Sequence, residues 1–223
     1  MKKLILEKLR AKACFNKKGF TLVELLIVIV IIGVLASIGI VSYKGTQAVA
    51  RDSQRKSDLQ AIGTAYKMHY QDKKAWLFNN KELAAIGASA NCEGSNIAGD
   101  TCGAGWFNYK SSTYIVSIAH VLFAAGYISK EVIDPQLDPS NSANGTTGSG
   151  AKQYMKYFCY QGGSAKGIAL FAKLEKTKTV FSDSNSASLT ELDQCTLYKN
   201  GTYPLGTWMK NNSYGMNYGI IVK

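Results

Sequence analysis

An uncharged run of nineteen residues, from Leu25 to Tyr43, dominates the pattern of apolar and polar positions in this chain. A helix of about 20 apolar residues is long enough to cross the roughly 30 Å hydrocarbon core of a bilayer. Residues 1–19 hold seven Lys and Arg against one acidic residue, so this leader carries a net charge of +6. Because basic flanks stay on the cytoplasmic side of a membrane, we expect the leader in the cytoplasm and everything after Tyr43 outside it.

A cleaved secretory signal is the alternative for this apolar run. The apolar core of such a signal is about 7–15 residues long, which is shorter than the run here. The following Lys44-Gly45-Thr46-Gln47 also lacks a good small-x-small cleavage pattern. We therefore expect the segment to stay in the mature protein.

Helical periodicity continues after the uncharged run. Leu59, Ile62 and Tyr66 recur at spacings of three and four, which is one face of a helix. The sequence predicts one helix from about Thr21 to Gln71, with a membrane or filament-core part (20–43) and an amphipathic part (44–71). Five charged residues interrupt the apolar stripe, and we interpret them as a solvated face, with contacts between subunits as the second interpretation: Arg51, Asp52, Arg55, Lys56 and Asp58.

We expect residues 72–223 to form a globular head, which begins with a short helix and a loop. We expect a short helix at Lys81–Ile86, followed by a glycine-rich loop at Asn91–Gly105. A second apolar stripe from Tyr114 to Ala125 predicts a core helix that Gly126 ends, with His120 exposed beside it.

Strand-like patterns occupy the last third of the chain. Gln153–Tyr160 and Gly167–Leu174 predict a hairpin across Gln161–Lys166, and Tyr218–Val222 closes the sheet. Thr179–Phe181 and Thr202–Met209 are weaker strand candidates. The predicted class is α+β, with a long N-terminal helix packed on an antiparallel sheet.

Charge and cysteine content agree with an exported head. The whole chain carries +11 and the leader +6, so residues 20–223 carry an ordinary +5. Cys14 lies in the leader, so four of the five cysteines are expected outside the cytoplasm. An even number there predicts two disulfides. Three pairings are open, and we favour Cys92–Cys102 with Cys159–Cys195 because neighbouring closures fit the order of the segments. A metal site is the disfavoured alternative, because no CxxC occurs.

The junction between leader and apolar run resembles the processing site of type IV pilins and their relatives, the pseudopilins. The segment from Lys17 to Ile29 contains the elements of that site in the same order: a glycine, an aromatic residue, Thr, two apolar residues, Glu and an aliphatic run. The resemblance implies that a prepilin peptidase cuts after Gly19 and that Phe20 is then N-methylated. It also implies that Glu24 pairs with the amine of Phe20 in a neighbouring subunit.

The resemblance covers about residues 17–60 closely and implies the pilin architecture. Gly33 and Ser37, four residues apart, would let helices approach closely, and Gly39 with Gly33 lowers helix propensity. The chain departs from the family in having no proline in Ala36–Tyr43, and in its long leader.

An acid-proline segment at Asp134-Pro135 looks similar to the one that leads into the sheet of the major pseudopilins. Those proteins can bind calcium in the loops that follow, which makes Asp134 and Asp138, with Asp183 and Asp193, weak calcium candidates. No calcium-loop spacing is present, so we interpret them as acidic turn residues and expect no cofactor.

No motif of an enzyme accompanies His69 or His120, and we expect no catalysis. The sequence favours a structural subunit of a type IV pilus that serves adhesion, twitching motility or DNA uptake. Its expected partners are copies of itself, the prepilin peptidase, the inner-membrane assembly platform, the membrane before assembly, and DNA or a surface ligand. We expect an inner-membrane precursor and then an extracellular fibre. A pseudopilin of a type II secretion system is the alternative, and a single-pass anchored binding domain is the second alternative.

Overall fold

The computed structural model describes residues 19–76, 107, 118–136, 154–177, 181–197, 201, 203–211 and 215–223. The chain divides into two compact units, Met1–Gly45 and Thr46–Lys223. The helix expected at Lys81–Ile86 and the loop expected at Asn91–Gly105 lie outside the described residues.

Helix α1 (Leu22–Lys73) begins in the first unit and ends in the second. Its bounds lie within two residues of the predicted Thr21–Gln71. Its apolar part has the length and composition needed to span a membrane. At its end, the N–H of Lys74 donates to the carbonyl of Tyr70 at 2.8 Å, and Lys74 adopts a left-handed φ of 56°.

Three antiparallel strands form the sheet of the second unit in the order β1-β2-β3. They are β1 (Met155–Gln161), β2 (Ser164–Ala172) and β3 (Tyr218–Val222). The β1–β2 turn consists of Gly162 and Gly163, both at positive φ, which explains a tighter turn than the expected Gln161–Lys166. The bounds of β3 match the prediction, and the α+β class is confirmed.

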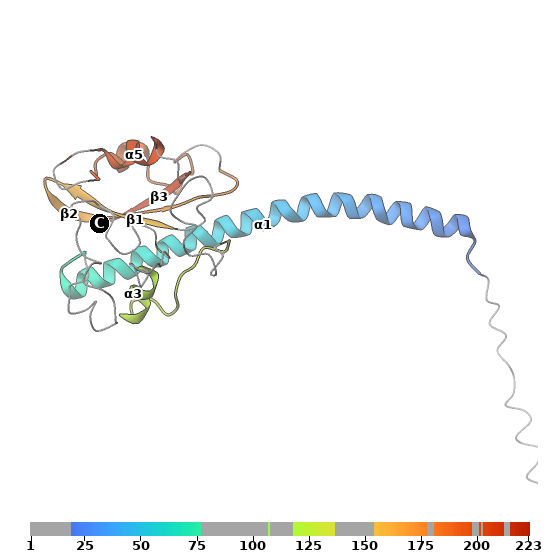
Figure 1. Cartoon of the computed structure of the whole chain (residues 1–223), viewed down its shortest axis with the longest axis horizontal. Coiled ribbons are helices and arrows are strands. Elements are labelled where there is room, and N and C mark those ends of the chain that lie inside the picture. The colour runs from blue at the N-terminus through green and yellow to red at the C-terminus, as the bar shows by residue number, and fades with distance from the viewer. Residues whose placement is uncertain are drawn as a thin grey trace, which may run out of the picture. The chain divides into compact units, whose positions relative to one another are not determined.

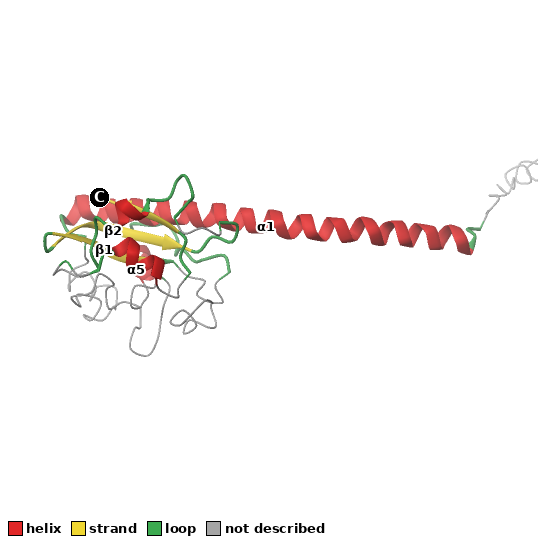
Figure 2. Cartoon of the chain, turned by 90° about the horizontal axis from the view of Figure 1, so that it is seen from above, coloured by secondary structure: helices red, strands yellow, loops and turns green. Residues whose placement is uncertain are grey.

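Within the second unit the sheet lies between α5 (Leu205–Asn211) on one side and α1 on the other (Figures 1 and 2). Tyr157 of β1 meets Trp208 of α5 with ring centroids 5.3 Å apart, whereas the next residue back, Lys156, lies over Tyr66 of α1. Both faces are therefore covered, and β1 is buried at six consecutive positions rather than alternating.

The helix approaches the sheet closely at Gly63. A Cβ there would stand 2.9 Å from Cγ2 of Val222 and 3.7 Å from Cδ1 of Leu170. The predicted stripe of Leu59, Ile62 and Tyr66 is buried beside this contact. Periodicity alone thus identified the face of α1 that packs on the head.

Helix α3 (Ile118–Ala124) confirms the part of the second stripe that the structure describes. Its buried side chains are Ile118, Ala119, Val121 and Leu122. Gly126 ends it at a φ of 80°, with its N–H donating to the carbonyl of Phe123. Residues 114–117 lie outside the described residues.

One strand candidate is wrong. Residues 205–209 of the Thr202–Met209 segment lie in helix α5, because Leu205 and Met209, four residues apart, are both buried on one helical face. Of Thr179–Phe181 the structure describes Phe181, which lies in a turn at a φ of 53°.

A disulfide joins Cys159 of β1 to Cys195, which confirms one of the two disulfides of the favoured pairing. Cys195 follows α4 (Leu189–Leu192), whose first turn is fixed by a capping box between Ser188 and Glu191. Cys92 and Cys102 lie outside the described residues.

Candidate functional site

Glu24 forms a capping box with Thr21 at the start of α1. Oε2 of Glu24 accepts the N–H and the hydroxyl of Thr21, each at 2.8 Å, and Oγ1 of Thr21 accepts the N–H of Glu24 at 3.2 Å. This reciprocal bonding satisfies donors at the helix start that would otherwise have no partner. The spacing Thr-x-x-Glu at Thr21 and Glu24 is the sequence signal of this capping box.

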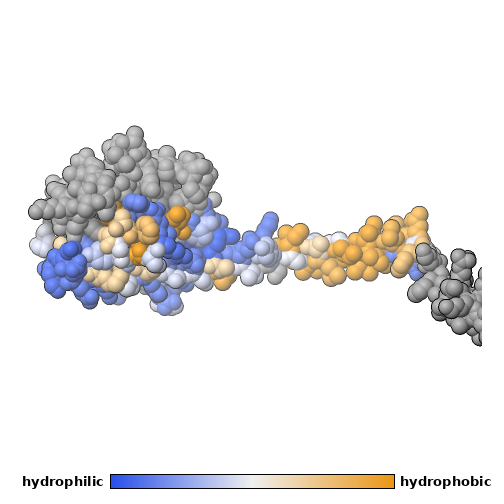
Figure 3. All heavy atoms as spheres, turned by 90° about the horizontal axis from the view of Figure 1, so that it is seen from below, coloured by the Kyte–Doolittle hydropathy of each residue, from blue (hydrophilic) through white to orange (hydrophobic). Residues whose placement is uncertain are grey.

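The first unit exposes an unusual amount of apolar surface. Fifteen large apolar side chains between Phe20 and Ile40 are exposed, and Phe20 itself is 83% exposed. The face of this segment seen in Figure 3 is almost wholly apolar. A contiguous apolar surface of this extent is typical of a protein or membrane contact.

The residues expected to pack helices together lie on this segment. A Cβ added at Gly33 or at Gly39 would have no neighbour within 4 Å outside the helix itself. Ser37 donates its hydroxyl to the carbonyl of Val34 at 2.7 Å. Close helix packing at Gly33, Ser37 and Gly39 therefore remains a prediction about contacts with another molecule.

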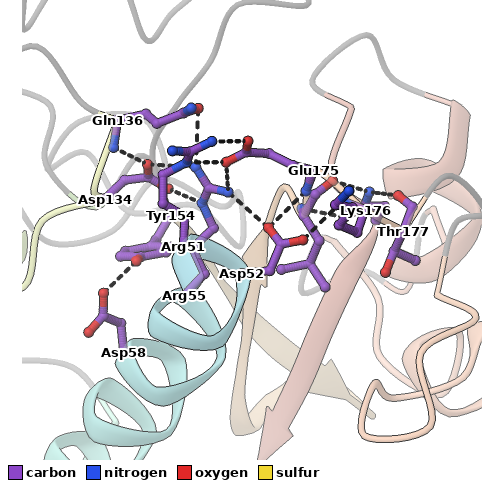
Figure 4. Close-up of polar contacts among 12 residues, drawn as sticks. Arg51, Asp52, Arg55, Asp58, Asp134, Gln136, Tyr154, Glu175, Lys176 and Thr177 are labelled. Carbon is purple, nitrogen blue, oxygen red and sulfur yellow. Dashed lines mark hydrogen bonds and ion pairs between the residues drawn. The ribbon is translucent and has the colours of Figure 1, made fainter. Parts of the chain in front are cut away.

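The expectation of a solvated face is wrong, because all five of its side chains are buried or partly buried: Arg51, Asp52, Arg55, Lys56 and Asp58. Arg55 is only 2% exposed, and its guanidinium binds both oxygens of Asp134, at 2.8 and 3.1 Å. The same guanidinium donates to Asp52 at 3.0 Å and to Glu175 at 2.7 Å (Figure 4). We call Arg51, Asp52, Arg55, Asp134 and Glu175 the ion-pair cluster.

Asp52 joins α1 to the chain that follows β2. Its two carboxylate oxygens accept the backbone N–H groups of Glu175 and Lys176, at 2.8 and 2.9 Å. Glu175 in turn accepts two hydrogen bonds from Arg51, at 2.8 and 2.6 Å. The ion-pair cluster therefore ties three segments together: α1, the segment that follows β2, and the Asp134 turn.

A second buried contact stands beside the cluster. The hydroxyl of Tyr154 donates to Asp58 at 2.5 Å, and the amide of Gln54 donates to the other oxygen of Asp58 at 2.6 Å. Burial raises the pKa of Asp58, against the opposing effect of these hydrogen bonds. Burial and the neighbouring carboxylate likewise raise the pKa of Tyr154.

Electrostatics within the cluster favour its charged forms. Hydrogen bonds from Arg51 lower the pKa of Glu175 to about 2, despite the opposing effect of burial, and Arg55 adds to the shift. Burial acts to lower the pKa of Arg55, but the bonds and charges of Asp134 and Glu175 outweigh it, so the pKa of Arg55 is raised.

The weak calcium candidates bind donors of the chain itself. Asp134 holds Arg55, Asp183 holds Lys56 at 2.5 Å, and Asp193 accepts the N–H and hydroxyl of Thr207, both at 2.7 Å. Asp138 lies outside the described residues. In the part of the chain that the structure describes, no three metal-ligating side chains gather at one place.

The two histidines occupy structural positions. His120 is only partly exposed, and its Nδ1 lies 2.5 Å from Oε1 of Glu131, so the expectation of a simply exposed histidine was wrong. His69 is buried, with Nδ1 2.9 Å from the carbonyl of Ala75.

Comparison with known proteins matches residues 14–40 to the prokaryotic N-terminal methylation motif. The chain is 45% identical over 58 residues to type IV major pilin protein PilA of Myxococcus xanthus, covering 26% of each chain. It is 35% identical over 75 residues to type II secretion system core protein G of Escherichia coli, covering 34% of this chain and 52% of the relative. Similarity to fimbrial protein EcpC of Eikenella corrodens is 37% over 81 residues, covering 36% and 51%. The matches span a quarter to about half the length of these relatives, and no solved structure matches the chain.

Replacing Arg55 should destabilise the head far more than replacing Arg51. Arg55→Leu leaves the buried carboxylates of Asp134 and Asp52 without their cation, which costs on the order of 3–5 kcal/mol of unfolding free energy. Arg51→Leu removes one half-exposed ion pair and should cost about 1 kcal/mol or less. Chemical denaturation of the full chain in detergent, followed by tryptophan fluorescence, measures both. Equal losses in the two variants would contradict the central position of Arg55.

Acid should weaken the head partly through Glu175. Its pKa in the folded state, about 2, lies below its ordinary value of 4.5. Its stabilising contribution is therefore complete above the ordinary value and is lost as pH falls toward 2. We expect Glu175→Gln to be less stable than the parent at pH 6 but to lose less stability between pH 6 and pH 2. Parallel stability curves for the two proteins over this range would contradict the assignment.

Proposed function

We propose that this chain, a type IV pilin-like protein, is a structural subunit that polymerises through its apolar N-terminal helix. The observation that carries the proposal is the exposed apolar surface of Phe20–Ile40, which directly follows a processing motif. Neighbouring copies can cover this surface only after the leader is gone, because the leader carries +6.

In this proposal a prepilin peptidase removes residues 1–19, and Phe20 becomes the methylated N-terminus. Glu24 then pairs with the amine of Phe20 in a neighbouring copy. Hydrogen bonds from Thr21 to Oε2 support the placement of the carboxylate but do not neutralise its charge. A carboxylate among apolar helices is costly unless a cation pairs with it, so the pair favours one axial register.

Before assembly the same helix anchors the chain in the inner membrane, with the leader in the cytoplasm and the head outside. An assembly platform in that membrane draws the subunits into a fibre. The fibre is extracellular and serves adhesion, twitching motility or DNA uptake, through a ligand such as DNA or a surface.

A periplasmic pseudopilus is the second candidate, because three matched relatives are core protein G of type II secretion systems. In that case the same helix would build a short fibre that supports protein export. The long head and its cysteines, including the Cys159–Cys195 disulfide, favour a surface fibre.

Surface filaments sheared from cells that express the chain should contain it as a main component. Mass spectrometry should find a polypeptide that begins at Phe20 and is one methyl group heavier than the unmodified sequence. Filaments built from chains that keep residues 1–19 would contradict processing. Cells without surface filaments, but with a defect in protein export when the chain is deleted, would favour the pseudopilus.

Glu24→Gln should separate the charge of Glu24 from its role at the helix start. Glutamine can still form a capping box with Thr21, so membrane insertion and helix content should be unchanged. A free energy of about 1.4 kcal/mol corresponds to a factor of ten in an equilibrium constant, and we expect the charged pair to supply at least this much. Loss of the pair should therefore lower filament yield at least about tenfold. The matched control is Thr21→Val, which disrupts the capping box and keeps the carboxylate, and which should still assemble. Normal filament yield in Glu24→Gln would contradict the pairing.

A further inference from the structure

Helix α1 begins directly after the peptide bond that we expect to be cut. Residues 19–21 lie in irregular chain, and the helix starts at Leu22 (Figure 2). Gly19 is exposed, and Phe20 is 83% exposed. The Gly19–Phe20 bond is therefore accessible, and it lies outside the helix although the helix starts close by.

The capping box occupies the two N–H groups through which the helix would continue backward. In an α-helix each N–H donates to the carbonyl four residues before it. A longer helix would therefore need the N–H of Glu24 on the carbonyl of Phe20, and the N–H of Thr21 on a carbonyl of the leader. Instead, Glu24 donates its N–H to Oγ1 of Thr21 at 3.2 Å, and Thr21 donates its N–H to Oε2 of Glu24 at 2.8 Å. The helical ladder begins only with the N–H of Leu25, which donates to the carbonyl of Thr21 at 3.2 Å.

The composition of the leader favours such a continuation. Residues 1–13 consist, apart from Ile5, of Met, Lys, Leu, Glu, Arg and Ala, which all have high helix propensity. Adding residues to an existing helix is also much easier than starting a new one. Gly19 opposes the continuation, because glycine is a poor helix former. The capping box and Gly19 together therefore keep the junction out of the helix.

A helical junction would be a poor substrate for a peptidase. In hydrolysis the hydroxyl of one water adds to the carbonyl carbon of Gly19, and the nitrogen of Phe20 leaves with the proton. Inside a helix the carbonyl of Gly19 would instead accept the N–H of Val23, and the neighbouring turn would cover it. When a segment opens and closes faster than it is cut, cleavage follows the population of the open form.

We propose that the capping box of Thr21 and Glu24 presents the Gly19–Phe20 bond for cleavage, by holding the start of α1 on the far side of that bond. This inference rests on the proposed function, in which a peptidase removes residues 1–19. Thr21 and Glu24 are positioning residues in this step, because the box controls the conformation of the bond and does not touch the reacting atoms. Glu24 then has two successive roles, as part of the cap in the precursor and as the partner of an amine during assembly.

Cleavage of the full chain by a purified prepilin peptidase in detergent micelles tests the proposal, with kcat and KM measured by mass spectrometry of the released leader. Thr21→Val removes the hydroxyl that accepts the N–H of Glu24, whereas Thr21→Ser keeps a hydroxyl there. Loss of a helix cap shifts the equilibrium about fivefold, so KM should rise about fivefold in Thr21→Val with kcat little changed, because the competent form is less populated. Thr21→Ser should restore the KM of the parent. An unchanged KM in Thr21→Val, or an equal rise in Thr21→Ser, would overturn the proposal.

A second pair of variants tests the other half of the box. Glu24→Leu should raise KM as Thr21→Val does, and Glu24→Gln should rescue it, because glutamine can re-form the box. In isotope-labelled chain, the Cα chemical shifts of Gly19 and Phe20 should move toward helical values in Glu24→Leu and Thr21→Val alone. A rise in KM without this movement would overturn the proposal.

The same assay separates this inference from the proposed function. If the parent chain is not cleaved after Gly19, the proposed processing fails. If the parent is cleaved and all four variants match it, processing stands and only the role of the capping box is overturned. Because slower cleavage still reaches completion, Thr21→Val should assemble into filaments in either case.

Discussion

Burial of a full positive charge on α1 is the constraint on which the head depends. The guanidinium of Arg55 can leave water only if carboxylates surround it, and Asp52, Asp134 and Glu175 do so from three different segments. A buried ion pair adds little net stability compared with apolar packing, but it disfavours any arrangement that leaves one partner alone. The cluster therefore fixes the positions of α1, the segment that follows β2 and the Asp134 turn relative to one another, while Leu59, Ile62 and Tyr66 supply the apolar burial.

The side chains of α1 have different surroundings in the two units. In the second unit the charged side chains of Arg55 and Asp58 find partners within the same chain, and the apolar stripe is covered by the sheet. In the first unit the large apolar side chains from Phe20 to Ile40 are exposed. In the proposed function, a head that satisfies its own part of the helix keeps one structure while the first unit exchanges lipid for protein neighbours.

Sequence reasoning succeeded where the determinants are local. The stripe of α1, the pairing of β1 with β2 as a hairpin, the bounds of β3 and the Cys159–Cys195 closure all follow from spacing or residue type along the chain. It failed at Arg55, whose partners Asp134 and Glu175 lie 79 and 120 residues away, because nothing in a local pattern reports a distant carboxylate. It also failed at α5, since a segment of seven residues is too short for strand and helix periods to be told apart.

Glu24 shows why a satisfied hydrogen bond does not settle the role of an acid. In water the capping box with Thr21 is enough, because solvent screens the remaining charge. In an apolar surrounding the hydrogen bonds from Thr21 still orient the carboxylate, but they are dipoles and leave its net charge in place. Transfer into such a surrounding therefore requires either a cation nearby or a proton on the carboxylate. The cap places the carboxylate at the first turn of α1, and in the proposed assembly the amine that cleavage after Gly19 creates in a neighbouring copy is the cation that pairs with it there.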